Sequence, residues 1–462
     1  MLNGLVLSFR KEIFLLYVLF PKVNNYYICK ITKLFAMYPR DLTKEILNKI
    51  HSREIIFMLG TRQAGKTTLT KLIAAASNFD KNHIFFFDFE DKEYRALFNL
   101  KNAGVQTLKN ILKIEGVNHE EKSLLIFDEI QLLTDPSNFL KLLYDYFPNL
   151  KVIATGSSSL KIKHKFSDSL AGRKIVYEVE PLNFNEFLLF RGEDKLLKIR
   201  KLFSEEKNKK SLKAVIESQH GKFLQLLEEY LIYGGYPEVT LLNFKNDKVE
   251  KLHSIADSYI KKDIRDIAGI KNIDAYNNLL KYLSVNTGNL INISSSGTYV
   301  GISSATIMKY IYLLKETFII DELIPFFINK NKEISKNKKI YFKDSGIRNL
   351  QIKNFNNLDI RTDAGILYEN YVFNRLEMEH DILINNYFYR TQSKTEIDFI
   401  SEKESSLLLV EVKSGRFNKR PKALFEFEKK YKSNFLQIKK MLINQSYYNF
   451  SGDISYIPAY LI

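Results

Sequence analysis

Apolar and polar positions follow one another along the first half of the chain in a way that predicts strands and helices in turn. Four short apolar runs, rich in β-branched or aromatic residues, are typical of strands in a parallel sheet. The run at 83–89 is apolar enough to predict a strand buried on both faces. Strands that alternate with helical stretches predict an α/β domain. The predicted strands are residues 55–59, 83–89, 124–127 and 152–154, and the predicted helices include residues 37–50, 67–76 and 109–114.

The middle of the chain has a helical pattern. Residues 223–240 contain a helix that Gly234, Gly235 and Pro237 bring to an end. Residues 275–327 contain, in order, a helix, a turn, a second helix and strand-like residues, which is the order of a winged helix. Such a module either reads DNA with its second helix or serves only to pack against protein. In a DNA reader, five side chains of the second helix would face the major groove: Ser303, Ser304, Thr306, Lys309 and Tyr310.

These patterns divide the chain into four parts. Residues 37–200 form the first α/β domain, residues 201–335 a helical linker with the winged-helix segment, and residues 336–462 a second α/β domain. Residues 1–36 have no clear period. Two interpretations of them stay open, namely an extension that forms a small helix, or a stretch that precedes the true start of translation at Met37.

The first predicted strand and the helix after it enclose a phosphate-binding loop. Residues 60–67 are GTRQAGKT and fit the pattern G-x-x-x-x-G-K-[ST]. The glycines allow a sharp turn whose amide groups point inward at phosphate oxygens, and the helix adds its positive dipole end. Lys66 is placed for the β- and γ-phosphates, and the Thr67 hydroxyl for Mg²⁺. The predicted nucleotide-binding residues of this loop are Gly60, Thr61, Arg62, Gln63, Ala64, Gly65, Lys66, Thr67 and Thr68.

Polar residues end the two later strands of this domain. The strand at 124–127 is followed by Asp128 and Glu129. After a phosphate loop, this acidic pair predicts that Asp128 holds Mg²⁺ and that Glu129 polarises the attacking water. The loop that follows the strand at 152–154 faces the ligand in a parallel sheet. We expect Ser157 to sense the γ-phosphate, with Thr155 as the second choice and a helix-capping turn as the alternative.

Composition gives information on binding partners and on the cellular compartment. The formal net charge of +16 over 462 residues favours a polyanionic partner, most simply nucleic acid. A single cysteine, Cys29, excludes an intramolecular disulfide and a cysteine-rich metal site, which fits a reducing cytoplasm. The longest apolar run, residues 13–20, is too short to cross a bilayer, and we expect no membrane partner.

The succession GTRQAGKTTL, LLIFDEIQ, IATGSSSL and LAGRKIVYEVEPLNFNEF resembles the AAA+ superfamily. More closely, it resembles the prokaryotic ATP-binding proteins in which an AAA domain is fused to a long C-terminal domain. The resemblance covers most of the chain from Met37 onward and implies ATP and Mg²⁺ as cofactors. It also implies that Arg173 is an arginine finger, inserted into the site of a neighbouring copy. If so, the chain would be a homo-oligomer. The alternative is that Arg173 is simply a charged residue at the edge of a strand.

A second group of charged residues lies near the C-terminus. Glu411 and Lys413 lie two residues apart on a predicted strand and therefore point the same way. A hairpin can bring Asp398 beside Glu411, and two carboxylates with a lysine form a site for Mg²⁺ or Mn²⁺. With Glu369 on the preceding helix, this arrangement resembles the PD-(D/E)XK nuclease superfamily. That resemblance implies Asp398 and Glu411 as metal ligands, Lys413 as a catalytic residue and Glu369 as an accessory ligand. The alternative is a strand hairpin with a surface ion pair.

The sequence therefore predicts an α/β protein that joins an AAA+-like parallel sheet, a winged-helix segment and a restriction-endonuclease-like domain. Its predicted function is hydrolysis of ATP with Mg²⁺ coupled to action on DNA, with Glu129, Arg173 and Lys413 as catalytic residues. Whether the C-terminal domain cuts DNA stays open. The alternative is a nucleotide-controlled switch that docks nucleic acid or a protein partner without cutting it.

Overall fold

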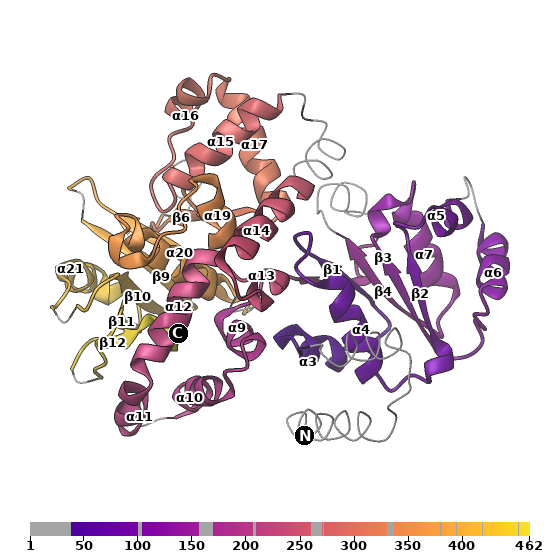
Figure 1. Ribbon diagram of the computed structural model, residues 1–462, viewed down its shortest axis with the longest axis horizontal. Helices are drawn as coiled ribbons and strands as arrows, with labels where there is room; N and C mark the ends of the chain where they lie inside the picture. The colour runs from indigo at the N-terminus through magenta and orange to yellow at the C-terminus, as the bar shows by residue number, and fades with distance from the viewer. Residues whose placement is uncertain are drawn as a thin grey trace.

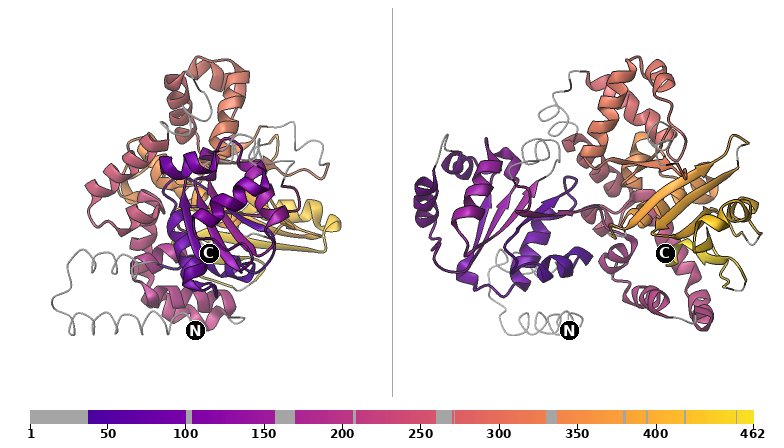
Figure 2. Two further views of the ribbon diagram at one scale, coloured as in Figure 1. Left: turned by 90° about the vertical axis from the view of Figure 1, so that its right-hand side faces the viewer. Right: turned by 180° about the vertical axis from the view of Figure 1, so that it is seen from behind.

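Two β-sheets organise the protein, and each has its own set of helices (Figure 1). The computed structural model describes residues 38–99, 104–156, 170–206, 209–259, 270, 272–329, 337–378, 381–393, 395–417, 419–450 and 452–462. The N-terminal sheet lies to one side, and the C-terminal part of the chain to the other, both from the front and from behind (Figure 2). Among the described residues, no helix is long and apolar enough to cross a membrane.

The N-terminal sheet has five parallel strands in the order β2-β3-β4-β1-β5, as the alternation of strands and helices predicted. Because the strands are parallel, their carboxyl ends meet at one edge, where β1 leads into the phosphate loop. The strands are β1 (Ile55–Leu59), β2 (Ile84–Asp88), β3 (Ser123–Asp128), β4 (Leu150–Gly156) and β5 (Lys174–Glu178).

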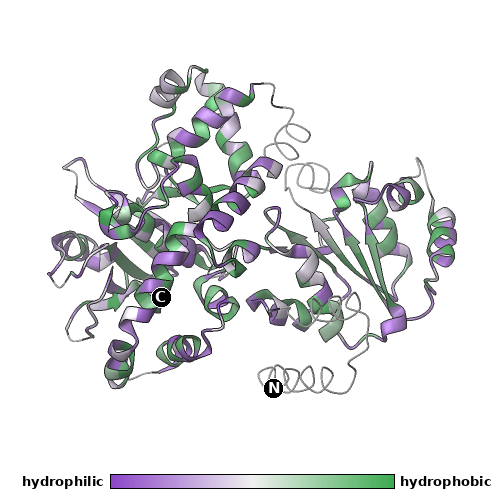
Figure 3. Ribbon diagram, in the orientation of Figure 1, coloured by the Kyte–Doolittle hydropathy of each residue, from purple (hydrophilic) through white to green (hydrophobic). Residues whose placement is uncertain are grey.

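Helices cover both faces of this sheet. Side chains alternate along β1, so Ile56 and Met58 belong to the core that α3 and α4 cover on one face, while Phe57 belongs to the core that α5, α6 and α7 cover on the other. The apolar interiors of the strands stand out between polar outer helix faces in Figure 3. The helices are α3 (Asp41–Asn48), α4 (Lys66–Ala76), α5 (Lys92–Phe98), α6 (Val105–Ile114) and α7 (Pro136–Tyr146).

The prediction that residues 83–89 are buried on both faces was wrong. Strand β2 is an edge strand of the sheet, and its side chain Phe86 is 44% exposed. Helix α4 packs over β3 and β4 instead, so the corresponding face of β2 is only partly covered. The opposite face of β2 carries Phe87, which stacks on Phe127 within the core.

The C-terminal sheet has seven strands in the order β12-β11-β10-β9-β8-β6-β7. Its core also holds Phe184 and Leu188 of α9 and Phe203 of α10. Residues that precede position 200, the end of the predicted first domain, therefore already pack with the C-terminal sheet. Strands β6 and β7 belong to the same sheet, which therefore continues across residue 335. The strands are β6 (Ile320–Pro325), β7 (Lys339–Phe342), β8 (Ile384–Arg390), β9 (Glu396–Lys403), β10 (Ser406–Val412), β11 (Gln437–Asn444) and β12 (Ser455–Pro458).

The remaining helices connect and cover the two sheets. Helix α12 ends where Gly234 takes a positive φ of 77°, as its glycine pair predicted. Helices α15, α16 and α17 pack around one core and stand apart at the top of Figure 1. The set comprises α9 (Phe184–Phe190), α10 (Asp194–Glu205), α11 (Lys213–Ser218), α12 (His220–Tyr233), α13 (Pro237–Leu241), α14 (Lys245–Tyr259), α15 (Ile273–Val285), α16 (Ile293–Val300), α17 (Ser304–Glu316), α19 (Ser345–Gln351), α20 (Ala364–Glu377) and α21 (Lys422–Tyr431).

Candidate nucleotide and carboxylate sites

The phosphate loop connects the end of β1 to the start of α4. Gly60 has no room for a side chain, because an added Cβ would lie 2.0 Å from the Val179 carbonyl oxygen. Gly65 takes the left-handed conformation, with φ at 93°, and directly precedes α4. The backbone of the loop therefore packs closely against Val179 at Gly60 and turns sharply at Gly65.

Lys66 is buried at the start of α4 and is only 5% exposed. Its ammonium group donates to the carbonyl oxygens of Gly60 and Thr61, at 2.9 and 2.8 Å. Within the described part of the chain, two buried side-chain oxygens of the loop, Thr61 Oγ1 and Gln63 Oε1, lack a hydrogen-bond partner. A cradle with a buried cation and a hydroxyl that can donate, that of Thr61, fits a phosphate-bearing ligand.

The acidic end of β3 faces the same loop. The Thr67 hydroxyl donates to Asp128 Oδ2 at 2.6 Å, which brings together the two groups predicted to hold Mg²⁺. Thr155 lies at the end of β4 and is fully buried. Its hydroxyl bonds to the second Asp128 oxygen and accepts the Glu129 backbone N–H at 3.1 Å. The Thr155 hydroxyl therefore fixes both acidic residues relative to one another.

Glu129 occupies a left-handed backbone conformation, with φ at 55°. Outside glycine, such a conformation is uncommon and frequently marks a functional turn. The Glu129 carboxylate accepts a hydrogen bond from the side-chain amide of Gln131, which is 3% exposed. The predicted base is thus held in one orientation by a buried neighbour.

We expect Thr155→Val to lower kcat for ATP hydrolysis about tenfold while ATP affinity stays within about twofold, because only the positioning of Asp128 and Glu129 is lost. Steady-state turnover and equilibrium binding measure the two effects. Thr287→Val is the matched control, since the hydroxyl of this buried threonine donates to the carbonyls of Leu283 and Ser284 in its own helical region. An unchanged kcat in Thr155→Val would contradict the role given to this hydroxyl.

Arg173 lies at the amino ends of the strands of the N-terminal sheet, opposite the end that carries the phosphate loop. Its carbonyl accepts the backbone N–H of Ile55, the first residue of β1, so about 13 Å of strand separate it from the phosphate loop of its own chain. Its guanidinium pairs with Asp145 at 3.0 Å and lies 5.8 Å from the centre of the Tyr144 ring. Arg173 is therefore not part of the phosphate site in its own chain.

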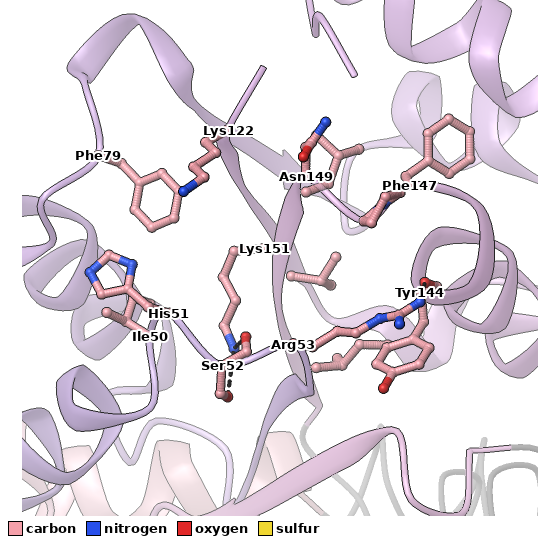
Figure 4. A pocket seen from close by; sticks show the side chains of 14 residues that line it. Ile50, His51, Ser52, Arg53, Phe79, Lys122, Tyr144, Phe147, Asn149 and Lys151 are labelled. Carbon is pink, nitrogen blue, oxygen red and sulfur yellow. Dashed lines mark hydrogen bonds between the residues drawn. The ribbon is translucent and has the colours of Figure 1, made fainter. Parts of the chain in front are cut away.

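A cavity of about 300 Å³ lies near Arg173, at the amino ends of β1 and β4 (Figure 4). Lys151 points across it and donates to three backbone carbonyls, those of Lys49, Ser52 and Glu54, at 3.1, 2.8 and 2.6 Å. Burial lowers the pKa of Lys151 to about 8. Because these carbonyls hold the ammonium, we interpret Lys151 as a clamp on residues 49–54, and this cavity is separate from the phosphate loop.

The C-terminal carboxylates gather in the second sheet with two lysines. Asp398 Oδ2 accepts the Val412 N–H at 2.7 Å, which brings it beside the strand that carries Glu411. Lys413 pairs with Glu411 at 2.6 Å, and the other Glu411 carboxylate oxygen is buried without a described partner. Burial, together with the charges of Glu369 and Glu411, raises the pKa of Asp398 well above its usual value.

Lys339, on β7, was not foreseen at this site. It is 2% exposed and pairs with Glu369 at 3.1 Å and with Glu396 at 2.7 Å. Burial lowers the pKa of Lys339, but these carboxylates more than offset it and raise the pKa above its ordinary value. Tyr341 also donates to Glu369, at 2.6 Å. Glu369 therefore already has two donors in the structure.

Helix α17 presents only part of the face predicted to meet DNA. Ser303, Ser304 and Lys309 are exposed, and Thr306 is half-buried. The prediction for Tyr310 was wrong, because Tyr310 is 6% exposed and packs on Tyr276 in the core of the helical module. Positions 307, 310, 311 and 314 share the buried face at helical spacing.

Comparison with known proteins bears on the first of these sites. Residues 52–188 match the family model of an AAA domain. Residues 224–358 and 364–462 match two further models, each described as a domain of unknown function. The parallel sheet, the phosphate loop and this match support an AAA-type nucleotide-binding ATPase domain.

Several relatives extend over most of the chain. An uncharacterized protein of Methanocaldococcus jannaschii is 28% identical over 399 residues, which are 85% of this chain and 81% of the relative. An uncharacterized protein of Haemophilus influenzae is 26% identical over 389 residues, which are 82% of this chain and 87% of the relative. Among solved structures, the Walker-type ATPase of Pyrococcus abyssi is similar with a TM-score of 0.41 and 14% identity, over 68% of this chain and 96% of that one.

The structure thus places most predicted residues of the AAA domain around one loop. Lys66, Thr67, Asp128 and Glu129 come together, and Thr155 joins them. Thr68 is exposed on α4 beside the loop. Ser157 lies outside the described residues. Sequence spacing gave no sign of Gln131, since its contact depends on the left-handed turn at Glu129.

Proposed function

We propose that the AAA domain binds ATP with Mg²⁺ and hydrolyses it to ADP and phosphate. The observation that carries this proposal is the 2.6 Å contact between the Thr67 hydroxyl and Asp128, directly beside the buried Lys66. Thr67 and Asp128 would hold the ion, which would neutralise phosphate charge when bound. ATP turnover of the purified full chain, with and without Mg²⁺, tests the proposal.

The chain's own groups divide the remaining work. Lys66 exchanges loop carbonyls for β- and γ-phosphate oxygens, which are stronger partners for an ammonium group. Glu129 orients a water and takes its proton as the water oxygen bonds to the γ-phosphorus and the bond to the β-phosphate oxygen breaks. Thr155 holds the strand end from which Glu129 projects.

Arg173 supports assembly as part of this function. It lies at the far edge of the sheet from its own phosphate loop, so it reaches such a loop only in a neighbouring copy. There it would stabilise charge that develops in the transition state. A homo-oligomer with shared sites follows, and its turnover would rise with protein concentration.

DNA is the proposed polyanionic partner, because the chain carries a net charge of +16 and α17 exposes Ser303, Ser304 and Lys309. Binding through phosphate contacts must weaken as salt rises, with a slope of about −0.9 per contact in a plot of log K against log salt. Filter binding across a salt series measures this slope. A flat line would argue against nucleic acid as the partner.

The carboxylate site is proposed to hold Mg²⁺ or Mn²⁺ and to cut DNA. Asp398 and Glu411 would hold the ion. One buried carboxylate oxygen of Glu411 has no described hydrogen-bond partner, as expected of an oxygen that binds a cation. Among the described residues, however, no group of three His, Cys, Asp or Glu side chains is close enough to enclose a metal ion. Glu369 would therefore have to leave Lys339 before it could act as a third ligand.

We expect Lys413→Ala to reduce nicking of supercoiled DNA by about a hundredfold, because its ammonium would stabilise charge on the phosphate in the transition state. The assay contains Mn²⁺ or Mg²⁺ and ATP. Lys403→Ala is the control, since Lys403 is exposed on β9 and pairs with Asp381 on the surface. Equal nicking by the wild type and Lys413→Ala would rule out this role.

The pairing of Lys339 with Glu369 and Glu396 favours a second candidate function. A built-in cation neutralises two carboxylates without any metal, as expected of a nuclease-like fold that binds but does not cut. The protein would then be a nucleotide-controlled switch for nucleic acid or a protein partner. Salt-dependent DNA binding without nicking under any metal condition would favour this alternative.

A further inference from the structure

Arg40 is a buried arginine just before α3, and it is 8% exposed. A buried guanidinium is costly unless its donors are satisfied. Here Nη1 donates to the Ala64 carbonyl of the phosphate loop at 3.0 Å, and Nη2 donates to the Glu180 carbonyl at 2.8 Å. Nε donates to Glu186 at 2.8 Å. One side chain thus joins the phosphate loop to the two segments that follow β5.

Glu186 fixes the orientation of Arg40. Besides the ion pair, its carboxylate accepts the backbone N–H groups of Asp41 and Asn183, at 2.9 and 3.1 Å. Glu186 is 4% exposed and lies in the first turn of α9. Helix α9 packs into the core of the C-terminal sheet through Phe184. The Arg40–Glu186 pair therefore connects the phosphate loop to the C-terminal part of the protein.

The bond to Ala64 has a direct consequence for phosphate binding. A peptide group is planar and trans, so the Ala64 carbonyl and the Gly65 N–H point in opposite directions. Arg40 holds the carbonyl on the outer side of the loop, where an added Cβ at Gly65 would lie 4.0 Å from Arg40 Nη1. The Gly65 N–H then points to the inner side, toward the predicted phosphate.

We propose that Arg40 is a positioning residue for the phosphate loop and that, through Glu186, it couples nucleotide binding to α9. This proposal rests on the nucleotide binding proposed above. A phosphate on the Gly65 N–H polarises the peptide group and strengthens the Arg40 bond to the Ala64 carbonyl. By reciprocity, a weaker Arg40–Glu186 pair lowers nucleotide affinity.

Hydrogen exchange and calorimetry on the full chain test this coupling. In the wild type, Mg-ADP should slow amide exchange in residues 60–67 and also in α9. Arg40→Lys cannot keep all three contacts, so it should bind Mg-ADP about tenfold more weakly and lose the response in α9. Arg53→Lys, at the opposite edge of the sheet, should match the wild type. Wild-type affinity in Arg40→Lys, or protection of the loop without any change in α9, would overturn the proposal.

Two further arms keep the test decisive. If Mg-ADP leaves wild-type exchange unchanged, the proposed nucleotide function fails. The Arg40 inference is then decided without nucleotide, since Arg40→Lys must speed exchange of residues 60–67 and equal rates overturn it. If Arg40→Lys does not fold, Glu186→Gln replaces it, because glutamine keeps the acceptor but loses the charge. Its expected loss of affinity is about threefold, and unchanged affinity counts against the coupling.

Discussion

Lys66→Ala is expected to lower kcat/KM for ATP by about a thousandfold and to weaken binding of ATP and ADP alike. Lys66 is the buried cation of the phosphate loop, and its loss removes charge-assisted bonds to two phosphates at once. Calorimetry gives the affinities, and phosphate release under saturating and limiting ATP gives the kinetic constants.

Lys71→Ala is the control for this substitution. Lys71 lies in the same helix, α4, but its side chain is exposed. The control should bind and hydrolyse ATP as the wild type does, so that any effect of a lysine-to-alanine change on the helix itself is accounted for. Turnover in Lys66→Ala within threefold of the control would be incompatible with the site described above.

Glu129→Gln should separate binding from chemistry. We expect kcat to fall about a thousandfold, since an amide takes up no proton from the attacking water. ATP affinity should stay within about threefold, because Glu129 contributes no group to the phosphate cradle itself. Equilibrium binding of labelled ATP, followed by single-turnover hydrolysis of the bound nucleotide, measures both in one preparation.

Glu93→Gln serves as the control, since Glu93 is exposed in the first turn of α5, on the same domain. It should leave both quantities unchanged. If Glu129→Gln hydrolyses bound ATP at the wild-type rate, another group accepts the proton, and the role of the acidic strand end is reduced to holding the ion.

The strands and helices of the AAA domain follow from local sequence, because apolar runs and helical spacing are properties of short segments. The phosphate loop was predictable for the same reason, since its glycines, lysine and threonine lie within eight residues. The failure at β2 has a different origin. Whether a strand lies at the centre or at the edge of a sheet depends on strand order, which a single apolar run does not contain.

Tyr310 shows an error that the sequence could have prevented. Ile307, Tyr310, Ile311 and Leu314 repeat at helical spacing, which marks Tyr310 as part of the buried face. The side chain lies in the core that α15 and α17 share with β6 and β7.

Long-range contacts limited the prediction of both sites. Arg40 and Glu186 are 146 residues apart, and no local pattern relates them. Lys339 was placed on a predicted strand, but its partners Glu369 and Glu396 come from a helix and from another strand. Buried charges of this kind become visible only when the sheet order is known, because burial and pairing are tertiary properties.

Calorimetric titration of the folded wild-type protein with ATP and with ADP, in buffer containing Mg²⁺, tests the central claim most directly. The account predicts uptake of one nucleotide per chain, abolished or strongly weakened by Lys66→Ala and preserved in Lys71→Ala. Absence of binding heat for both nucleotides, confirmed by an unchanged unfolding temperature at saturating concentration, would contradict it.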